Sequence, residues 1–223
     1  MRLVDISFTS PRLNLIFDEF LLYLAQKKGD SFLRFWEPED YFIVLGKTSK
    51  QREELYSQKC KQDNIPVLRR CSGGASILQG RGCLNYAVVD RYESHPDYKG
   101  IKSCFGRILG LIAKALSKEG VRLDYTGISD LSFKGKKVSG NSQKRGKNTF
   151  LVHGTLLYNF GIERVDTYLK IPLKTPACRK NRTNLDFLTN IPASCESIKQ
   201  AVIEAFGAQE SCSPSNLRFP ELG

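Results

Sequence analysis

The sequence predicts an α+β domain built around a largely antiparallel or mixed sheet flanked by helices. Helical and strand-like segments alternate irregularly, without the regular strand–helix–strand order of a parallel α/β fold. Several predicted strands are close neighbours joined by short turns. The chain has 223 residues, 41% of them hydrophobic, which is enough for one domain with a sizeable core.

We expect one domain over residues 1–207 and a flexible tail at 208–223, because the composition turns to Ser, Pro, Gln and Asn after Gly207. No stretch approaches the roughly 18 consecutive apolar residues of a membrane helix. The N-terminus lacks the apolar run of a secretory signal. The sequence therefore predicts a cytoplasmic protein without a membrane partner.

The charge is strongly basic, with 34 Lys and Arg against 23 Asp and Glu and a net charge of +11. Charge alone is compatible with nucleic acid, with nucleotide phosphates or with an acidic protein partner. The densest basic cluster, Lys134–Lys147, is interleaved with Gly and Ser rather than with aromatic residues. No nucleic-acid partner is therefore predicted.

Cysteine and histidine usage argues against disulfides and metal ligands. The seven cysteines are odd in number, no C-x-x-C pair occurs, and only two histidines are present. A disulfide framework or a zinc site would show pairing or metal-ligand spacing.

The first half of the chain begins with a clear helix. Ser10-Pro11 is typical of a helix start, and apolar residues from Leu13 to Leu24 recur at helical spacing, which predicts a helix over about 11–27. A polar surface helix is expected at Arg52–Lys61. Strands are predicted at Phe32–Trp36 and Tyr41–Leu45, joined by a turn, and at Val67–Arg69, Ser76–Leu78 and Leu84–Val89.

The second half contains a second amphipathic helix, Cys104–Lys118, stopped by Gly120. Further on we expect a hairpin of residues 131–133 and 137–139, a strand at Thr149–Tyr158, a short helix after Gly161, a loop at Ile171–Lys180 and a last helix, Glu196–Phe206, capped by Ser194.

A glycine-rich segment, Arg69-Arg70-Cys71-Ser72-Gly73-Gly74-Ala75-Ser76, follows a predicted strand. Adjacent glycines let a backbone approach a ligand closely, and arginine holds phosphate or carboxylate in a bidentate manner. The segment matches neither the Walker A loop nor the dinucleotide-binding pattern. It predicts an anion-binding loop, with a simple tight turn as the alternative.

A lysine-rich hairpin carries the second polar group. If Lys137 opens a strand, Lys137, Ser139 and Asn141 share one face and Val138 lies on the other. A cation, a hydroxyl and an amide together suit a polarised carbonyl or phosphate oxygen. The alternative is an exposed hairpin with solvated lysines, which is what we expect of Lys134 and Lys136. A lone histidine in an apolar strand, such as His153, is more often structural than catalytic.

In this order, these segments resemble the lipoate–protein ligase A family, part of the biotin/lipoate ligase and octanoyltransferase superfamily. The ordered set is specific although each motif alone is weak, and a further similar segment is Arg179–Leu188. The matching motifs span about residues 10–160 and are Asn14…Asp18-Glu19, Val44-Leu45-Gly46-Lys47, Arg69-Arg70-x-Ser72-Gly73-Gly74, Gly82-x-Leu84-Asn85, Gly127-x-x-Asp130-Leu131, Gly135-x-Lys137-Val138-Ser139-Gly140-x-x-Gln143 and His153-Gly154-Thr155-Leu156-Leu157.

The resemblance implies an α+β catalytic domain with a bent sheet around its pocket. It implies a lipoate–protein ligase that makes lipoyl-adenylate from lipoate, ATP and Mg²⁺. The acyl group would then pass to a lysine of an acidic lipoyl carrier domain, in a 2-oxoacid dehydrogenase E2 subunit or the glycine-cleavage H protein. Lys137 would be the catalytic residue at the activated carboxyl and α-phosphate. No metal ligand is implied, and the adenylate pocket would comprise Arg70, Ser72, Gly73, Gly74, Ala75, Asn85, Asp130, Ser139, Gly140, His153, Gly154 and Thr155.

The sequence departs from the family pattern at four places. Ala75 replaces the usual third glycine, Gln79-Gly80 replaces a frequent His-Asp, Ser129 stands where Asn is frequent, and Ser49-Lys50 replaces Gln-Asn. We also expect no accessory C-terminal domain, so the chain could require a separate accessory subunit.

Two other functions stay open, and a nucleic-acid binder, which would bind duplexes or single strands tightly and in a salt-sensitive manner, is the third. An octanoyl or lipoyl transferase would act through a cysteine thioester, for which Cys178 is the candidate nucleophile, although an incidental loop cysteine is the simpler interpretation. A non-catalytic acyl-adenylate-binding homologue would explain the departures as a decayed site.

Overall fold

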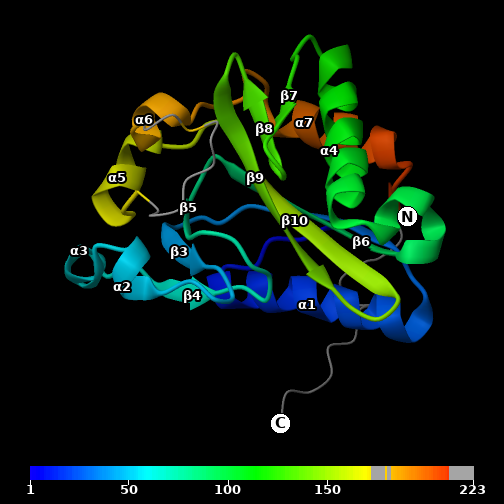
Figure 1. The fold of residues 1–223 in the computed structure, drawn as a ribbon, viewed down its shortest axis with the longest axis horizontal. Coiled ribbons are helices and arrows are strands. Elements are labelled where there is room, and N and C mark those ends of the chain that lie inside the picture. The colour runs from blue at the N-terminus through cyan, green and yellow to red at the C-terminus, as the bar shows by residue number, and fades with distance from the viewer. Residues whose placement is uncertain (172–178, 180–181, 211–223) are drawn as a thin grey trace.

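The computed structural model describes residues 1–171, 179 and 182–210, and Figure 1 shows one large mixed sheet with helices around it. The large sheet has eight strands in the order β11-β1-β2-β6-β10-β9-β8-β7, and a small sheet has the order β4-β3-β5. In the large sheet β1 is parallel to β2 and β11, and the other pairs are antiparallel. The predicted α+β class is therefore confirmed. The strands are β1 (Arg2–Asp5), β2 (Phe32–Trp36), β3 (Phe42–Leu45), β4 (Val67–Arg69), β5 (Ile77–Gln79), β6 (Cys83–Arg91), β7 (Asp124–Thr126), β8 (Asp130–Phe133), β9 (Lys136–Arg145), β10 (Thr149–Leu157) and β11 (Gln209–Glu210).

Both faces of the large sheet are covered by helices. The longest are α1 (Pro11–Lys28), α4 (Ile101–Lys118) and α7 (Cys195–Phe206). Residues of α1 share one hydrophobic cluster with Phe32 and Val89, and residues of α4 and α7 share another with Leu33 and Val88. Neighbouring strand residues thus point to opposite faces, as the pleat requires. The short helices are α2 (Gln51–Glu54), α3 (Ser57–Gln62), α5 (Val165–Tyr168), α6 (Asn184–Phe187) and the 3₁₀ turns η1 (Tyr92–Ser94), η2 (Pro96–Lys99) and η3 (Ile162–Arg164).

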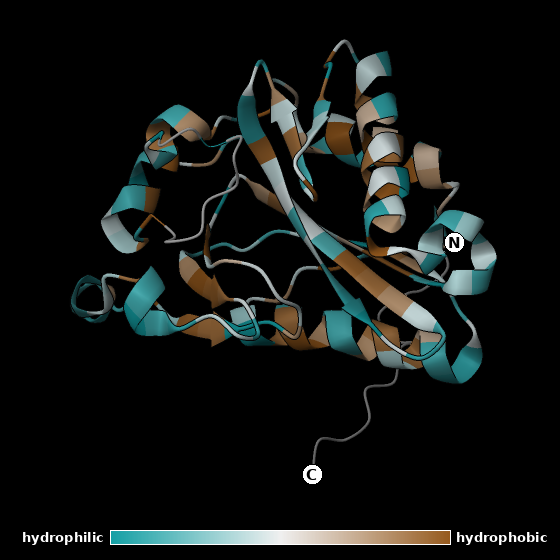
Figure 2. Cartoon of the chain, viewed as in Figure 1, coloured by the Kyte–Doolittle hydropathy of each residue, from teal (hydrophilic) through white to brown (hydrophobic). Residues whose placement is uncertain are grey.

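Local sequence signals locate the long helices correctly. The Ser10 side chain accepts a hydrogen bond from the Leu13 amide, and Ser194 caps α7 in the same way through the Ser197 amide. In Figure 2, α1 and α4 carry both hydrophobic and hydrophilic residues, as helices with one face on a sheet do. No helix among the described residues is long and apolar enough to cross a membrane.

The structure differs from the prediction where pairing is non-local. The single helix expected at Arg52–Lys61 is two short helices, because the Tyr56 amide bonds to the Tyr168 carbonyl and Leu55 forms a bridge with Leu169. Strands β2 and β3 form as predicted but belong to different sheets.

At the C-terminal end, Gln209–Glu210, expected in the tail, pairs with β1 at the sheet edge. Residues 211–223 lie outside the described residues, as does most of the loop expected at Ile171–Lys180.

Candidate active site

A cavity of about 300 Å³ lies where β5 and the glycine-rich segment, residues 69–76, face β9 and β10. Helices α5 and α6 contribute a further wall. Of the predicted site residues, those that line the cavity are Arg70, Gly74, Ala75, Asn85, Asp130, Lys137, Ser139, Gly140, His153, Gly154 and Thr155. Ser72 and Gly73 do not line it, but both are hydrogen-bonded to residues that do.

Lys137 lies at the start of β9, with its Nζ 3.0 Å from the Asp130 Oδ2 on β8. About a quarter (26%) of the lysine side chain is exposed. A Cβ on Gly140 would come within 2.9 Å of the Lys137 Nζ, so a larger residue there would displace the ammonium group. Val138 is buried in the core, whereas Lys137, Ser139 and Asn141 line the cavity, which confirms the predicted alternation.

Asn141, which the sequence placed on the polar face but not in the site, is fixed by several hydrogen bonds. Its Oδ1 accepts from the Tyr86 hydroxyl at 2.6 Å, and its Nδ2 donates to the Ser129 carbonyl at 2.7 Å. A Cβ on Gly154 would lie 1.7 Å from the Asn141 Oδ1. The glycine of the His-Gly-Thr motif is therefore required for the close approach of β9 and β10.

Arg70 holds the glycine-rich segment together and also points into the cavity wall. Its Nη2 donates to the carbonyls of Gly73, at 2.6 Å, and Ala75, at 3.0 Å. Its Nη1 is buried and has no hydrogen-bond partner among the described residues. Burial lowers the pKa of Arg70 to about 10, so the group is charged at neutral pH. A charged donor left unpaired in a cavity wall fits an anionic oxygen of a ligand.

Arg69, in contrast, takes no part in the cavity. It is exposed, and its Nη1 donates to the carbonyls of Gly46, at 2.5 Å, and Ser49, at 2.9 Å. Of the two arginines of this segment, Arg70 lines the cavity and Arg69 does not, because successive residues of an extended chain point to opposite sides.

A chain of hydrogen bonds runs from the core to the glycine-rich segment. The Arg34 Nη1 lies 2.5 Å from the Asp18 Oδ1, and both side chains are buried. The Asp18 Oδ2 lies 3.1 Å from the His153 Nδ1, and the His153 Nε2 lies 2.5 Å from the Ser72 Oγ. With Nδ1 donating to the carboxylate, Nε2 accepts the Ser72 proton, an assignment that follows from the network. His153 is thus both structural and part of the cavity wall.

A second buried network includes Gln79, one of the departures from the family pattern. The Gln79 Nε2 donates to the Asn85 Oδ1 at 2.9 Å and to the Thr155 Oγ1 at 2.7 Å. Asn85 donates back to the Gln79 Oε1 at 2.9 Å. All three side chains are buried. Gln79 therefore completes the hydrogen bonding of two predicted site residues.

The C-terminal part adds cavity residues that the sequence prediction did not assign. Arg179 is buried and donates to the Asn184 Oδ1 at 2.7 Å, and burial lowers its pKa. This part reaches the site because Leu188 forms a bridge with Lys137. The similarity of Arg179–Leu188 was the only signal for it. The apolar wall of the cavity includes Leu15, Trp36, Val44, Ile77, Leu78, Leu157, Phe160, Val165, Leu169, Phe187 and Leu188.

Neither a thiol in the cavity wall nor a cluster of three metal-ligating side chains occurs in the part of the chain that the structure describes. None of its five free cysteines lines the cavity, and burial raises the pKa of each: Cys60, Cys71, Cys83, Cys104 and Cys195. No group of three His, Cys, Asp or Glu residues that could hold a metal occurs among these residues. The predicted alternative nucleophile, Cys178, lies outside the described residues.

A cavity lined by apolar side chains and by the cations Arg70 and Lys137 suits a small amphipathic acid. The family model of the lipoyl protein ligase A/B catalytic domain matches residues 10–207. The chain belongs to this family. The resemblance drawn from the motifs is thereby confirmed.

Similar members of the lipoyl protein ligase family are longer than this chain. Lipoate–protein ligase 1 of Staphylococcus aureus is 28% identical over 92% of this chain and 62% of its own length. Lipoate-protein ligase LplJ of Bacillus subtilis is 27% identical over 74% of this chain and 48% of its own. The chain thus spans about half to three fifths of these relatives.

Solved structures share the fold. A bipartite lipoate protein ligase of Thermoplasma acidophilum, described with its E2 lipoyl domain, has a TM-score of 0.80 at 22% identity, covering 94% of this chain and 86% of that one. A putative lipoate protein ligase from the same organism with bound lipoic acid has a TM-score of 0.77 at 21% identity, covering 92% and 84%. A lipoate-protein ligase A bound with ATP has a TM-score of 0.77 at 22% identity, covering 94% and 87%.

Proposed function

We propose that this chain is the catalytic part of an ATP-dependent lipoate–protein ligase. It would activate lipoate as lipoyl-adenylate and transfer the lipoyl group to a lysine of a lipoyl carrier domain. One observation carries the proposal: a single cavity of a lipoyl protein ligase domain has both an apolar wall and two cationic side chains. The cations are Lys137 and Arg70, whose Nη1 has no described hydrogen-bond partner. The relatives that bind ATP and lipoic acid support it.

In the first step, a carboxylate oxygen of lipoate bonds to the α-phosphorus of ATP, and the bond to the leaving pyrophosphate breaks. Negative charge grows on the phosphate oxygens in the transition state. Arg70 would supply a guanidinium to an anionic oxygen, and Lys137 would supply an ammonium from another side chain that lines the same cavity. Fixed cations of this kind stabilise the transition state without reorganising solvent.

Mg²⁺ would enter with ATP, because magnesium commonly binds substrate phosphates with only one or two protein carboxylates. When bound, it supplies positive charge to the leaving pyrophosphate. Among the described residues that line the cavity, the carboxylates are Asp18, which is 2% exposed and paired with Arg34 in the core, and Asp130, which is 13% exposed and paired with Lys137. Asp130 is therefore the residue that would share the ion.

In the second step, the acceptor lysine amine attacks the acyl carbon, the bond to the AMP oxygen breaks, and the amine loses a proton. Lys137 would stabilise the negative charge that develops on the carbonyl oxygen. Attack by an amine on an adenylate needs positioning and no covalent enzyme intermediate. The raised thiol pKa of the described cysteines agrees with this route.

The direct test is the intact mass of a purified apo lipoyl domain after incubation with this protein. One reaction contains lipoate, ATP and Mg²⁺, and the other contains octanoyl-acyl carrier protein without ATP. A lipoyl mass gain only in the first reaction supports the ligase. A gain only in the second, lost in Cys178→Ser, would establish the transferase instead.

The proposal also includes a partner protein. The bipartite archaeal ligase supports a separate accessory subunit. Full transfer by the isolated chain would argue against such a requirement. The carrier class, the boundary at residue 207 and the cytoplasmic location stay predictions.

A further inference from the structure

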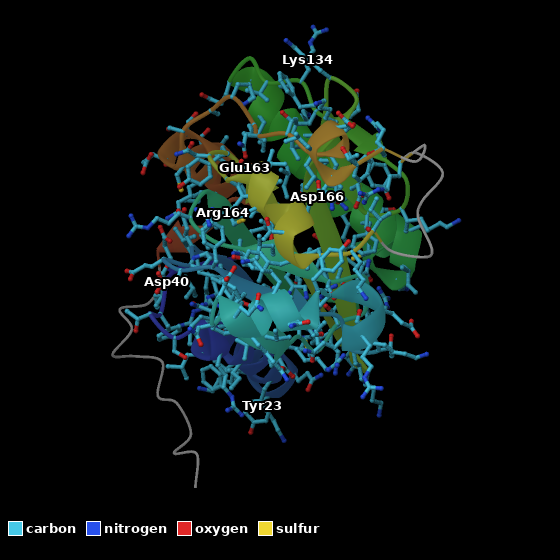
Figure 3. The ribbon with its side chains drawn as sticks, turned by 90° about the vertical axis from the view of Figure 1, so that its left-hand side faces the viewer. Tyr23, Asp40, Lys134, Glu163, Arg164 and Asp166 are labelled. Atoms are coloured by element: carbon cyan, nitrogen blue, oxygen red, sulfur yellow. The ribbon has the colours of Figure 1, made fainter. Side chains whose placement is uncertain are left out.

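A second concave surface adjoins the cavity on its α5 side. It is a groove of about 720 Å³ between α2–α3 and α5. In Figure 3 the labelled Asp166 and its helix lie above the two cyan helices on the face toward the viewer. The groove is lined by Arg52, Leu55, Tyr56, Ser57, Gln58, Lys59, Gln62, Asp166, Thr167 and Lys170.

Helix α5 separates the groove from the cavity, and Lys170 borders both. Val165 and Leu169 line the cavity, whereas Asp166 and Thr167 line the groove. The floor is preformed, since the Lys170 amide donates to the Glu54 carbonyl at 2.8 Å. A partner in the groove would therefore meet a rigid surface that leads to the cavity.

The groove has the composition of a protein-binding surface. Tyr56 is 48% exposed, and the Lys170 Nζ lies 5.7 Å from its ring centroid. Exposed tyrosine and arginine are the residues that most often dominate binding energy at protein interfaces. Among the described residues that line the groove, the charged side chains are the cations Arg52, Lys59 and Lys170 and the carboxylate Asp166.

The cations are also available to a partner. Lys59 is paired with Asp63 at 2.9 Å, but neither Arg52 nor Lys170 forms an ion pair within the described part of the chain. The Lys170 Nζ instead donates to the Arg52 backbone carbonyl at 2.8 Å, which fixes the ammonium group over α2. An acidic surface would find two positive charges in this groove, of which Lys170 is fixed beside an aromatic ring.

We propose that this groove is the docking surface for the acidic carrier domain, whose acceptor lysine enters the cavity past Lys170. The proposal rests on the proposed function, because only an acyl-transfer enzyme must bring a folded carrier to the cavity mouth. It names the surface that selects the carrier, separately from the residues that make the adenylate.

The test separates the two half-reactions. Pyrophosphate release without carrier measures adenylate formation, and transfer rates at increasing apo lipoyl domain give KM for the carrier. We expect Arg52→Glu and Tyr56→Ala each to raise that KM by about tenfold while adenylate formation stays at the wild-type rate.

Two matched controls come from other faces. Lys114→Glu makes a like charge reversal on exposed α4, and Tyr23→Ala removes a tyrosine that is 50% exposed and also lies near a lysine. Neither residue lines the cavity or the groove. Both controls should keep the carrier KM within about twofold of wild type. Groove variants that behave like the controls would overturn the docking proposal.

If the wild-type protein forms no adenylate even with the accessory subunit of a bipartite ligase added, the proposed function fails, and docking is judged by binding alone. Chemical shifts of a labelled apo lipoyl domain are followed as unlabelled protein is added. Binding that Arg52→Glu weakens and Lys114→Glu does not supports the groove. Equal binding by both variants, or no binding by wild type, contradicts it.

Discussion

Two groups of charged side chains border the same cavity and differ in how fully they are paired. In the first, Arg34 and Asp18 are buried against each other, and Asp18 continues to His153. In the second, Lys137 is partly exposed beside Asp130, and the Nη1 of Arg70 is buried without a described partner. In the first group the opposite charges are paired with each other, whereas the second leaves one charged donor of the cavity wall without a described hydrogen-bond partner.

Because the two groups are paired to different degrees, we expect one to determine stability and the other to determine activity. A buried ion pair contributes little net stability, but removal of one partner leaves an uncompensated buried charge. A cation held beside an empty volume instead gains its full interaction only when negative charge arrives. Substitutions in the first group should therefore lower the free energy of unfolding, and those in the second should lower turnover with the fold intact.

The largest effect is expected for Asp18→Ala. It should lower the free energy of unfolding by about 3–5 kcal/mol, because Arg34 then stays buried without a counter-charge. Urea unfolding followed by circular dichroism measures this. Asp40→Ala, at an exposed position, is the control and should change stability by less than about 0.5 kcal/mol. Equal stability of the two variants would mean that the buried pair is not a scaffold.

Lys137→Ala tests the other group. Loss of a preorganised cation at the reacting carbonyl should reduce turnover by about 10²–10³-fold. The unfolding midpoint should stay near wild type, because the side chain is partly exposed. Lipoyl transfer to an apo domain is measured by mass, with Lys136→Ala, an exposed neighbour, as control. Near-normal turnover in Lys137→Ala would refute the assigned role.

Gln79→Leu tests whether the hydrogen bonds of Gln79, a residue that departs from the family pattern, contribute to the stability of the site. It removes the three hydrogen bonds that Gln79 makes with Asn85 and Thr155 and leaves only the bond between those two residues and the weaker bond from Asn85 to the Cys83 carbonyl, which should lower stability by about 1–3 kcal/mol. Adding Thr155→Val should cost less than the sum of the two single losses, because both remove one network. Gln58→Leu, on the exposed side of α3, is the control in the same denaturation series. Strict additivity would show that the network is not coupled.

Local signals made much of the fold predictable from the sequence. Helix α1 follows from its cap and apolar spacing, and the β8–β9 hairpin from its Lys-Gly turn. The expected helix at Arg52–Lys61 fails because its break depends on backbone bonds to residues 168–170, more than a hundred positions away. A local sequence pattern cannot predict a backbone hydrogen bond between residues so far apart in the chain.

The site was predictable to the extent that its residues lie in motifs. Lys137, Asp130 and His153 line the cavity as the resemblance implies, although their roles stay predictions. The place of Gln79 was not predictable, because its partners Asn85 and Thr155 lie on β6 and β10. Only the three-dimensional register shows that a residue outside the family pattern still satisfies them.

The smallest effect concerns Glu54, which belongs with the paired group although it lies nearer the surface. Its Oε2 accepts hydrogen bonds from the Ser76 amide and hydroxyl, both at 2.6 Å. Burial raises the pKa of Glu54, but hydrogen bonds from Ser76 and Ser49 and the charge of Arg70 outweigh it and leave the pKa below its usual value of 4.5. The carboxylate therefore anchors the end of the glycine-rich segment.

A folded-state pKa below the unfolded value gives stability that is present above pH 4.5 and is lost as the pH falls through the folded-state pKa. Glu54→Gln keeps an accepting oxygen without the charge. It should be less stable than wild type at pH 7 by under about 1 kcal/mol, and the difference should shrink on acidification. Urea unfolding between pH 7 and acid measures this, with exposed Glu53→Gln as control. A gap that does not change with pH would show that Ser76 is held by oxygen geometry alone.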